Sequence, residues 1–433
     1  MMAIRSFNPG KLMKRPWKRL ILLILLLVVA MFLLGSSAVL PSDQTEQVRA
    51  YTRDIEFDYI AWTLDAIGVK LKQLALGSIS YLPEGSRRQL LLDYLDLITQ
   101  IQRGESELYG VYADPNTVDP QAATTDLRSH LQNLYDRRAQ LAPLVEGTLQ
   151  DQVSQAASAL GLSLGGQPVP PVLYHTTPLP LALIVSPRNT IRQDENISLI
   201  PDLTVDQRAA LEDGVDRALD VSSLVVGIGG VGVYPTMVMQ TSDINWLAEV
   251  VAHEWVHNYL TLRPLGVSYL NSPELRIMNE TAASIAGKEI GKALMEKNYP
   301  QLLPPPPEPA VSSPQPQKPA VPPPFDFRAE MHETRVTTDQ LLAEGKIEEA
   351  EKYMEQRRAF FWDNGYRIRK LNQAYFAFYG AYADQPGGAA GEDPVGAAVR
   401  ALRAQSDSLA DFLNRISWMS SFEQLQRAVT GPS

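Results

Sequence analysis

The feature that most limits how this chain can fold is an unbroken run of uncharged residues from Leu20 to Leu40, followed by Pro41. A helix needs about 20 apolar residues to cross the hydrocarbon core of a bilayer, and this run has 21 residues. Residues 1–19 contain six Lys or Arg and no acid, and such a basic flank stays on the cytoplasmic side. We therefore expect a basic cytoplasmic tail (1–19), a single-pass anchor in the cell membrane (20–40) and an extracytoplasmic body.

A cleaved signal peptide is the alternative interpretation of this segment, because Ser36, Ser37 and Ala38 offer small residues at suitable cleavage positions. The run is long for the apolar part of a signal peptide, which favours a retained anchor. Both interpretations export the remainder of the chain.

The composition narrows the chemistry of the body. The whole chain has 39 Lys or Arg against 49 Asp or Glu, and removing the basic tail makes the remainder still more acidic. Because an acidic body repels phosphate backbones, we expect no nucleic-acid partner. Cysteine is absent, which excludes disulfides, thiolate metal sites and thiol nucleophiles. Any metal must therefore be bound by Asp, Glu or one of five histidines.

The spacing of apolar residues divides the body into regions of different predicted secondary structure. Three-to-four spacing predicts a helical N-terminal region over 41–165, with a loop at 112–124. Strand-like segments follow, with one helix between them that begins at a capping box on Thr204. Two further helices are expected, one from Ser242 or Asp243 to about Arg263 and one from Pro273. The candidate strands are 181–185, 197–200, 224–233 and 236–240.

The second half of the chain contains a proline-rich segment. Residues 301–325 are predicted to form an extended linker or an exposed insertion, because 11 prolines fall within 304–324. Helix is expected again over 326–433, in one run to about Ala383 and a second from Val395 to Val429. The region between 166 and 300 is then the predicted catalytic core.

A glycine-rich stretch, Gly227 to Gly232, matches the GxGxxG pattern of dinucleotide-binding folds. That chemistry requires a helix N-terminus directly after the glycines, whereas the residues that follow, 233–239, are typical of extended chain. We therefore predict a hairpin or bulge in which glycine permits a close backbone approach.

His253, Glu254 and His257 form the sequence HEWVH. On a helix, positions i and i+4 project from one face, so both imidazoles can reach a single ion. Glu254 lies about 100° further around the helix, where it can accept a proton from a water on that ion. A surface helix with two unrelated histidines is the alternative. It is disfavoured because residues 250–252 and 255–262, outside the motif, carry no charge, and buried polar groups need partners.

A tetrahedral catalytic site needs a third protein ligand and leaves one position for water. Glu280 lies 23 residues after His257 on the second predicted helix, and the short segment 264–271 can turn the chain back. Glu274 and Glu289 on the same helix are the alternatives. We predict that His253, His257 and Glu280 bind one Zn²⁺.

The motif together with residues 279–283, Asn-Glu-Thr-Ala-Ala, resembles the gluzincins, zinc peptidases in which HExxH is followed by NExx[AS] on a nearby helix. The resemblance covers about 243–291 and implies a zincin-like core. It also implies an edge strand that holds extended substrate, for which 232–240 is the candidate. The sequence departs at Ser284, where thermolysin-like members carry an Asp that orients the first histidine; a backbone carbonyl can serve instead. Residues 333–335 and 371–374 are weakly similar to a bacterial predicted-aminopeptidase family with the same motif.

Peptide hydrolysis usually also needs a donor for the developing oxyanion. Asn372, Tyr375, Tyr379 and Tyr382 recur at spacings of three, four and three, which predicts one helical face. Such a stripe is often core, yet a tyrosine hydroxyl can donate while its ring packs. We assign this role to Tyr382, with Tyr379 and His332 as alternatives.

The predicted fold class is α+β and predominantly helical, with a small sheet, two metal-ligand helices and a helical C-terminal region that completes the cleft. The predicted function is a membrane-anchored zinc metallopeptidase that acts on peptides or proteins outside the cytoplasm, with Glu254 as general base. A membrane-tethered zinc-binding scaffold and a peptide-binding assembly factor are the non-catalytic alternatives, and another metal-dependent hydrolase is the catalytic one.

Overall fold

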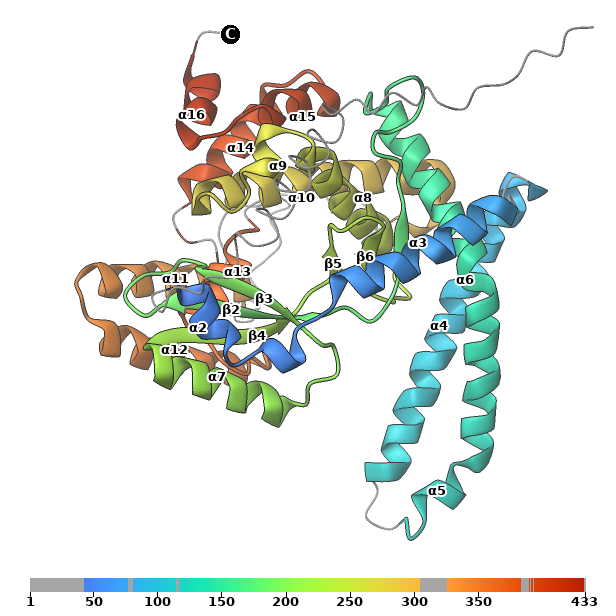
Figure 1. Ribbon diagram of the computed structural model, residues 1–433, viewed down its shortest axis with the longest axis horizontal. Coiled ribbons are helices and arrows are strands. Elements are labelled where there is room, and N and C mark those ends of the chain that lie inside the picture. Colours follow the sequence, from blue (N-terminus) through green and yellow to red (C-terminus); the bar gives the residue numbers. More distant parts are fainter. Residues whose placement is uncertain are drawn as a thin grey trace, which may run out of the picture. The chain divides into compact units, whose positions relative to one another are not determined.

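The computed structural model (Figure 1) describes residues 43–76, 81–113, 117–303, 325–382, 389, 391 and 393–431. The chain divides into two compact units, Met1–Arg53 and Asp54–Ser433. The predicted tail, the predicted anchor and the proline-rich segment 304–324 lie outside the described residues. Within the described ranges, no helix has both the length and the apolar character needed to cross a membrane.

Helices dominate the described part of the chain and the strands form small sheets, which confirms the coarse prediction of fold class. In chain order the elements are α2 (Gln44–Arg49), η1 (Arg53–Ile55), α3 (Tyr59–Leu76), α4 (Glu84–Ala113), α5 (Pro120–Ala123), α6 (Thr125–Ala159), β1 (Tyr174–Thr176), β2 (Leu181–Pro187), β3 (Glu195–Leu199), α7 (Val205–Leu219), β4 (Val221–Gly227), β5 (Gly230–Val231), β6 (Thr236–Val238), α8 (Ile244–Thr261), α9 (Pro264–Val267), α10 (Pro273–Asn298), η3 (Pro300–Leu302), α11 (Phe327–Ala343), α12 (Ile347–Asp363), α13 (Gln373–Tyr379), α14 (Pro394–Ala404), α15 (Leu409–Ser417) and α16 (Phe422–Thr430).

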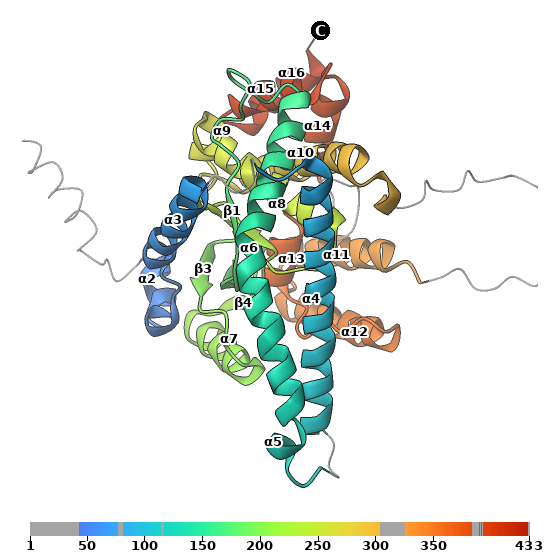
Figure 2. The same cartoon turned by 90° about the vertical axis from the view of Figure 1, so that its right-hand side faces the viewer.

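In the second unit, α4 and α6 form a long helical pair that Figures 1 and 2 show from two sides. The pair buries apolar residues such as Leu91 and Ile98 of α4 against Leu131 of α6. Their three-to-four spacing is what makes one face of each helix apolar. The predicted loop at 112–124 is partly wrong, because Asp119 caps the short helix α5 inside it.

The larger sheet has the strand order β3-β2-β4 and is antiparallel throughout. Ala182 and Ile184 of β2 share one face with Leu224 and Val226 of β4, and this face packs on Phe378 of α13. Helix α7 packs against β4 as well. Its N-terminus has the predicted capping box, in which Thr204 and Gln207 bond reciprocally.

The smaller sheet has the order β1-β6-β5, with β1 parallel and β5 antiparallel to β6. The sequence predicted one strand over 224–233, and this is wrong because the chain leaves the larger sheet after Gly227 and joins the smaller one at Gly230. The predicted hairpin at the glycines is present as the β5–β6 pair. The expected edge strand at 232–240 is wrong, because β6 in that stretch is the middle strand, paired with β1 on one side and β5 on the other.

Helices α8 and α10 pack on each other in the main core. Asp243 caps α8 through Asn245 and Trp246, and Ser272 caps α10 ahead of Pro273. Small residues allow the two helices to approach closely: a Cβ at Gly287 of α10 would lie 2.9 Å from the Cβ of His253.

The C-terminal region departs from the sequence prediction. The expected continuous helix from 326 to about Ala383 is interrupted at 344–346 and at 364–372, where the chain is not helical. The second expected run, Val395 to Val429, is divided into α14, α15 and α16. Asn372 caps α13 by accepting from the Tyr375 amide, and α13 ends at Tyr379. The prediction of one helical face from Asn372 to Tyr382 is therefore wrong, since only the middle of that stretch is helix.

Candidate metal centre

Two imidazoles of α8 face the same point. His253 and His257 are one helical turn apart, and their Nε2 atoms lie 3.0 Å from each other. Burial of the opposite side of the helix fixes this orientation, because Trp255 is packed in the core and its indole N–H donates to the carbonyl of Pro170. The helix therefore turns its polar residues toward a cavity and its apolar residues inward.

Glu280 of α10 completes this group. Its Oε2 lies 3.6 Å from Nε2 of His253 and 3.5 Å from Nε2 of His257. Ligand atoms of the three residues all lie within 4.8 Å of one another, so they could hold a metal ion. The alternatives are placed elsewhere: Glu289 is paired with Arg403, and Glu274 is exposed in the first turn of α10.

One oxygen of Glu280 has no hydrogen-bond partner. Oε2 is buried and accepts no hydrogen bond, although both imidazoles lie within ion-pair distance of it, whereas Oε1 accepts a 2.5 Å hydrogen bond from the hydroxyl of Tyr269. A buried carboxylate oxygen without a partner is costly, and a cation between it and the two imidazoles would satisfy it. Sequence reasoning missed Tyr269, which lies in the segment interpreted only as a turn between the helices.

The charges of this cluster are strongly coupled. Burial opposes ionisation of Glu280, but the attraction of His257 and His253 outweighs it and holds the pKa of Glu280 well below its usual range. Burial likewise opposes protonation of His257, yet Glu280 raises the pKa of His257 to about 9. Cationic charge is therefore favoured where the side chains meet, whether it is a proton or a metal ion.

A hydrogen bond from α10 orients the second histidine. Nδ1 of His257 donates to the amide oxygen of Asn279 over 2.8 Å, which leaves Nε2 free to face Glu280. Sequence reasoning assigned no role to Asn279, although the residue stood beside Glu280 in the motif. Ser284, which occupies the position of the Asp that orients the first histidine in thermolysin-like peptidases, lines the cavity.

Glu254 is buried and lines the same cavity. Burial raises the pKa of its carboxyl group, and the neighbouring imidazoles His253 and His257 oppose that rise. The chain of β5 lies directly on this carboxylate, because a Cβ at Gly230 would overlap Oε1 of Glu254. A Cβ at Gly232 would lie 2.8 Å from the Cβ of His257. The backbone at Gly230 and Gly232 therefore packs closely on α8, as the glycine stretch predicted.

The cavity in front of the three residues has a volume of about 1010 Å³. Distant parts of the second unit contribute to its wall, including Tyr59 of α3, Trp246 of α8 and Phe378 of α13. Arg276, one turn before Glu280, also lines it and donates to the carbonyl of Ala377. Sequence reasoning missed Arg276, because a lone arginine on a helix carries no local signal of burial.

Of the predicted oxyanion helpers, Tyr379 and Tyr382 line the cavity. The ring of Tyr382 lies 6.4 Å from that of His253, and 37% of the residue remains exposed. Loss of hydration at the hydroxyl, together with the negative charge of Glu280, raises the pKa of Tyr382 well above its usual value. This hydroxyl is therefore protonated at neutral pH. The other candidate, His332, belongs to α11 and is not among the residues that line this cavity.

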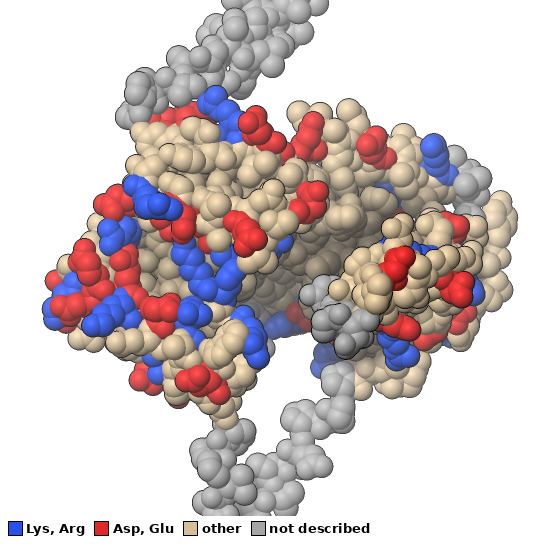
Figure 3. Space-filling view, turned by 90° about the horizontal axis from the view of Figure 1, so that it is seen from below, with Lys and Arg blue, Asp and Glu red and all other residues tan. Residues whose placement is uncertain are grey.

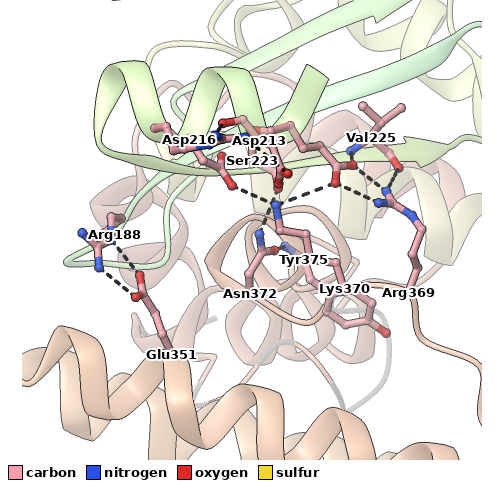
Figure 4. A network of polar contacts seen from close by, with 12 residues as sticks. Arg188, Asp213, Asp216, Ser223, Val225, Glu351, Arg369, Lys370, Asn372 and Tyr375 are labelled. Carbon is pink, nitrogen blue, oxygen red and sulfur yellow. Dashed lines mark hydrogen bonds and ion pairs between the residues drawn. The ribbon is translucent and has the colours of Figure 1, made fainter. Parts of the chain in front are cut away.

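A network of ion pairs and hydrogen bonds fixes the segment that leads into α13 (Figure 4). Arg369 pairs with the buried carboxylate of Glu212 in α7, and Lys370 donates to Asp216 over 2.8 Å. Asn372 donates to the carbonyl of Ser223 in β4. These contacts hold the start of α13 on the larger sheet, and α13 in turn carries Phe378 and Tyr379 into the cavity wall.

Lys and Arg side chains lie interspersed with Asp and Glu over the face shown in Figure 3. Elsewhere in the described residues, charged side chains form pairs such as Arg188 with Glu351 and Arg357 with Glu330.

Comparison of this chain with protein-family models, with curated proteins and with solved structures finds no match.

Proposed function

We propose that this protein is a membrane-anchored zinc metallopeptidase that hydrolyses peptide bonds outside the cytoplasm. One observation carries the proposal: His253, His257 and Glu280 bring three ligand atoms together in a cavity that Glu254 also lines. Metal ligands beside a separate, buried carboxylate are the combination required for metal-assisted hydrolysis. A purely structural metal site would not need Glu254. The anchoring part of the proposal rests on the uncharged run at 20–40.

The donor set fits zinc. Two imidazole nitrogens and one carboxylate oxygen are ligands that zinc takes in catalytic sites, with one position left for water. Ligands bound at about 2.0–2.1 Å in tetrahedral geometry are about 3.4 Å apart. The three residues are spaced at 3.0, 3.5 and 3.6 Å. Oε2 of Glu280, which accepts no hydrogen bond, is the oxygen that such an ion would bind.

Zinc bound by these residues would supply Lewis-acid chemistry, since it acidifies water and polarises a carbonyl group. Glu254 would act as general base, taking a proton from the attacking water and passing it to the leaving amine.

The protonated hydroxyl of Tyr382 would donate a hydrogen bond to the developing oxyanion. Asn279 and Tyr269 would keep His257 and Glu280 in place through the hydrogen bonds described above. These two residues would act on the reaction through the ligands that they position.

The edge of the smaller sheet offers a place for substrate. Strand β5 is the end strand in the order β1-β6-β5, and Gly230 and Val231 both line the cavity. An extended peptide could pair with this backbone and cross the cavity in front of Glu254. Such pairing recognises main chain, so it suits peptide substrates.

The experiment is a comparison of variants of the full-length protein in detergent. We expect wild-type protein to bind one zinc ion and to cleave a mixed peptide library until a chelator removes the metal. Glu254→Gln should keep zinc and lose cleavage, whereas Glu280→Ala should lose zinc. Glu274→Gln is the matched control, because Glu274 is an exposed acid on the same helix.

Two results would overturn the assignment. Full zinc content in Glu280→Ala would remove Glu280 from the ligand set. Zinc-loaded wild-type protein that cleaves nothing in the library would favour the non-catalytic scaffold.

A further inference from the structure

Helix α3 is attached to the body of the second unit through polar side chains. The hydroxyl of Tyr59 lies 2.8 Å from that of Ser198 at the start of the helix. Near its other end, Lys70 donates to Glu146 of α6 over 2.6 Å, and both side chains are only 3% exposed. The side of α3 that faces the protein therefore contains a buried lysine.

The outward side of the same helix is apolar. Ile60, Leu64, Ile67 and Leu71 follow one another at spacings of four, three and four residues, so they share one face. Their exposed fractions are 76%, 67%, 39% and 61%. We call these four residues the α3 stripe. A surface helix of a globular protein usually turns such a stripe inward. In α3 these four large apolar side chains face outward, whereas Lys70 is buried.

An exposed continuous apolar stripe indicates a partner, and two properties point to lipid. The stripe contains no charged residue. The exposed Asp65 and Lys72 lie along its flank, where the amine of Lys72 can reach lipid headgroups. The uncharged run that ends at Leu40 lies only 19 residues before Tyr59. A fully extended chain of that length reaches at most about 65 Å, and α2 and η1 within it shorten that reach, so an anchor at 20–40 limits how far α3 can lie from the bilayer.

A second copy of the chain fits the stripe less well. Stable protein interfaces bury about 800 Å² on each partner, and four side chains offer only part of that area. A helix lying at a membrane surface needs no such area when a neighbouring segment already holds the protein there.

We propose that the α3 stripe lies in the interfacial region of the membrane, with Ile60, Leu64, Ile67 and Leu71 inserted among the lipids. This inference rests on the proposed anchoring by residues 20–40. It goes beyond anchoring, because it assigns the body of the protein a fixed side that faces the bilayer.

The absence of cysteine makes a direct test possible. Single variants Leu64→Cys and Leu71→Cys of the full-length protein are labelled with an environment-sensitive fluorophore. They are then reconstituted into vesicles of phosphatidylcholine with a minor fraction of phosphatidylglycerol. Val118→Cys is the control, because Val118 is 99% exposed and precedes α5, at the end of α6 remote from Glu146. Circular dichroism checks that each variant is folded, which exposed positions should permit.

We expect lipids brominated along their acyl chains to quench the labels at 64 and 71 severalfold more than the label at 118. Flotation of the vesicles after alkaline washing reports the anchor separately. Protein that floats with equal quenching at all three positions would overturn the α3 inference and leave the anchor standing. Energy transfer between labelled copies at position 64 without lipid quenching would also overturn it. Protein that does not float would overturn both proposals.

Discussion

The amide oxygen of Asn279 accepts a hydrogen bond from Nδ1 of His257 over 2.8 Å. Helix α10 therefore supplies both the hydrogen bond that orients His257 and the carboxylate of the candidate metal ligands. The next residue, Glu280, faces the other nitrogen of the same ring. One helical segment therefore sets the tautomer of His257 and the position of the carboxylate beside it.

Replacement of Asn279 should weaken metal binding. In Asn279→Ala the ring of His257 loses its orienting acceptor, and we expect metal affinity to fall about 10- to 100-fold. Competition with a chromophoric chelator measures this change. Asn279→Asp keeps an acceptor oxygen and should recover most of the affinity. Equal affinities for wild type and Asn279→Ala would show that the hydrogen bond has no such role.

A methyl group at position 230 should damage catalysis without removing the metal. Because a Cβ at Gly230 would overlap the carboxylate of Glu254, Gly230→Ala must displace either β5 or the proposed base. Misplacement of a catalytic group by about 1 Å can reduce the rate about 100-fold. Peptide cleavage and zinc content are the two measurements. Gly85→Ala in α4 is the control, since nothing lies within 4 Å of a Cβ there and Gly85 is not among the residues that line the cavity; comparable losses in both variants would contradict the explanation.

Loss of the Tyr382 hydroxyl should lower turnover. Tyr382→Phe keeps the ring beside His253 and removes only the donor, so we expect kcat to fall about 100-fold with KM and zinc content little changed. Tyr375→Phe serves as the control, because Tyr375 is on α13 and is not among the residues that line the cavity. A loss found in Tyr379→Phe instead would transfer the role to Tyr379.

The attachment of α3 should depend on pH through Glu146. Burial opposes ionisation of this carboxyl group, but the hydrogen bond from His175 and the charge of Lys70 prevail and lower the pKa of Glu146 to about 2. The ordinary value is 4.5, so the unfolded chain binds the proton more readily. The resulting stabilisation is complete above about pH 4.5 and is lost as the pH falls toward 2.

From the size of that pKa difference, the loss amounts to about 3 kcal/mol of unfolding free energy. Urea unfolding between pH 7 and pH 2 measures it. Glu146→Gln leaves Lys70 buried without its partner and should be about 3–5 kcal/mol less stable at pH 7. Its stability should also change less between pH 4.5 and 2. Glu107→Gln, at an exposed position, should behave as wild type. Parallel pH profiles for wild type and Glu146→Gln would refute the prediction.

Much of the candidate metal centre could be predicted because its signals are local. The caps at Asp243 and Ser272 and the i, i+4 spacing of the histidines act within one or two helical turns. The C-terminal helices were predicted less well. The end of α12 has a local signal that was missed, because Asn364 follows its last residue and Gly365 has a φ of 90°. In that segment Arg369, Lys370 and Asn372 bond to α7 and β4, and such distant partners leave no periodic signal.

By itself, the sequence determined the motif helix α8, the second helix α10, the helical bias of the chain and the small residues that let helices approach. Backbone hydrogen bonding, capping and side-chain spacing decide these features over short distances. Only the tertiary structure decided that Glu280 meets the imidazoles, that Asn279 and Tyr269 support them, and that α3 turns its apolar side outward. Each of these depends on how separate elements pack against one another. The residue pattern of a single element does not show which other element will cover it.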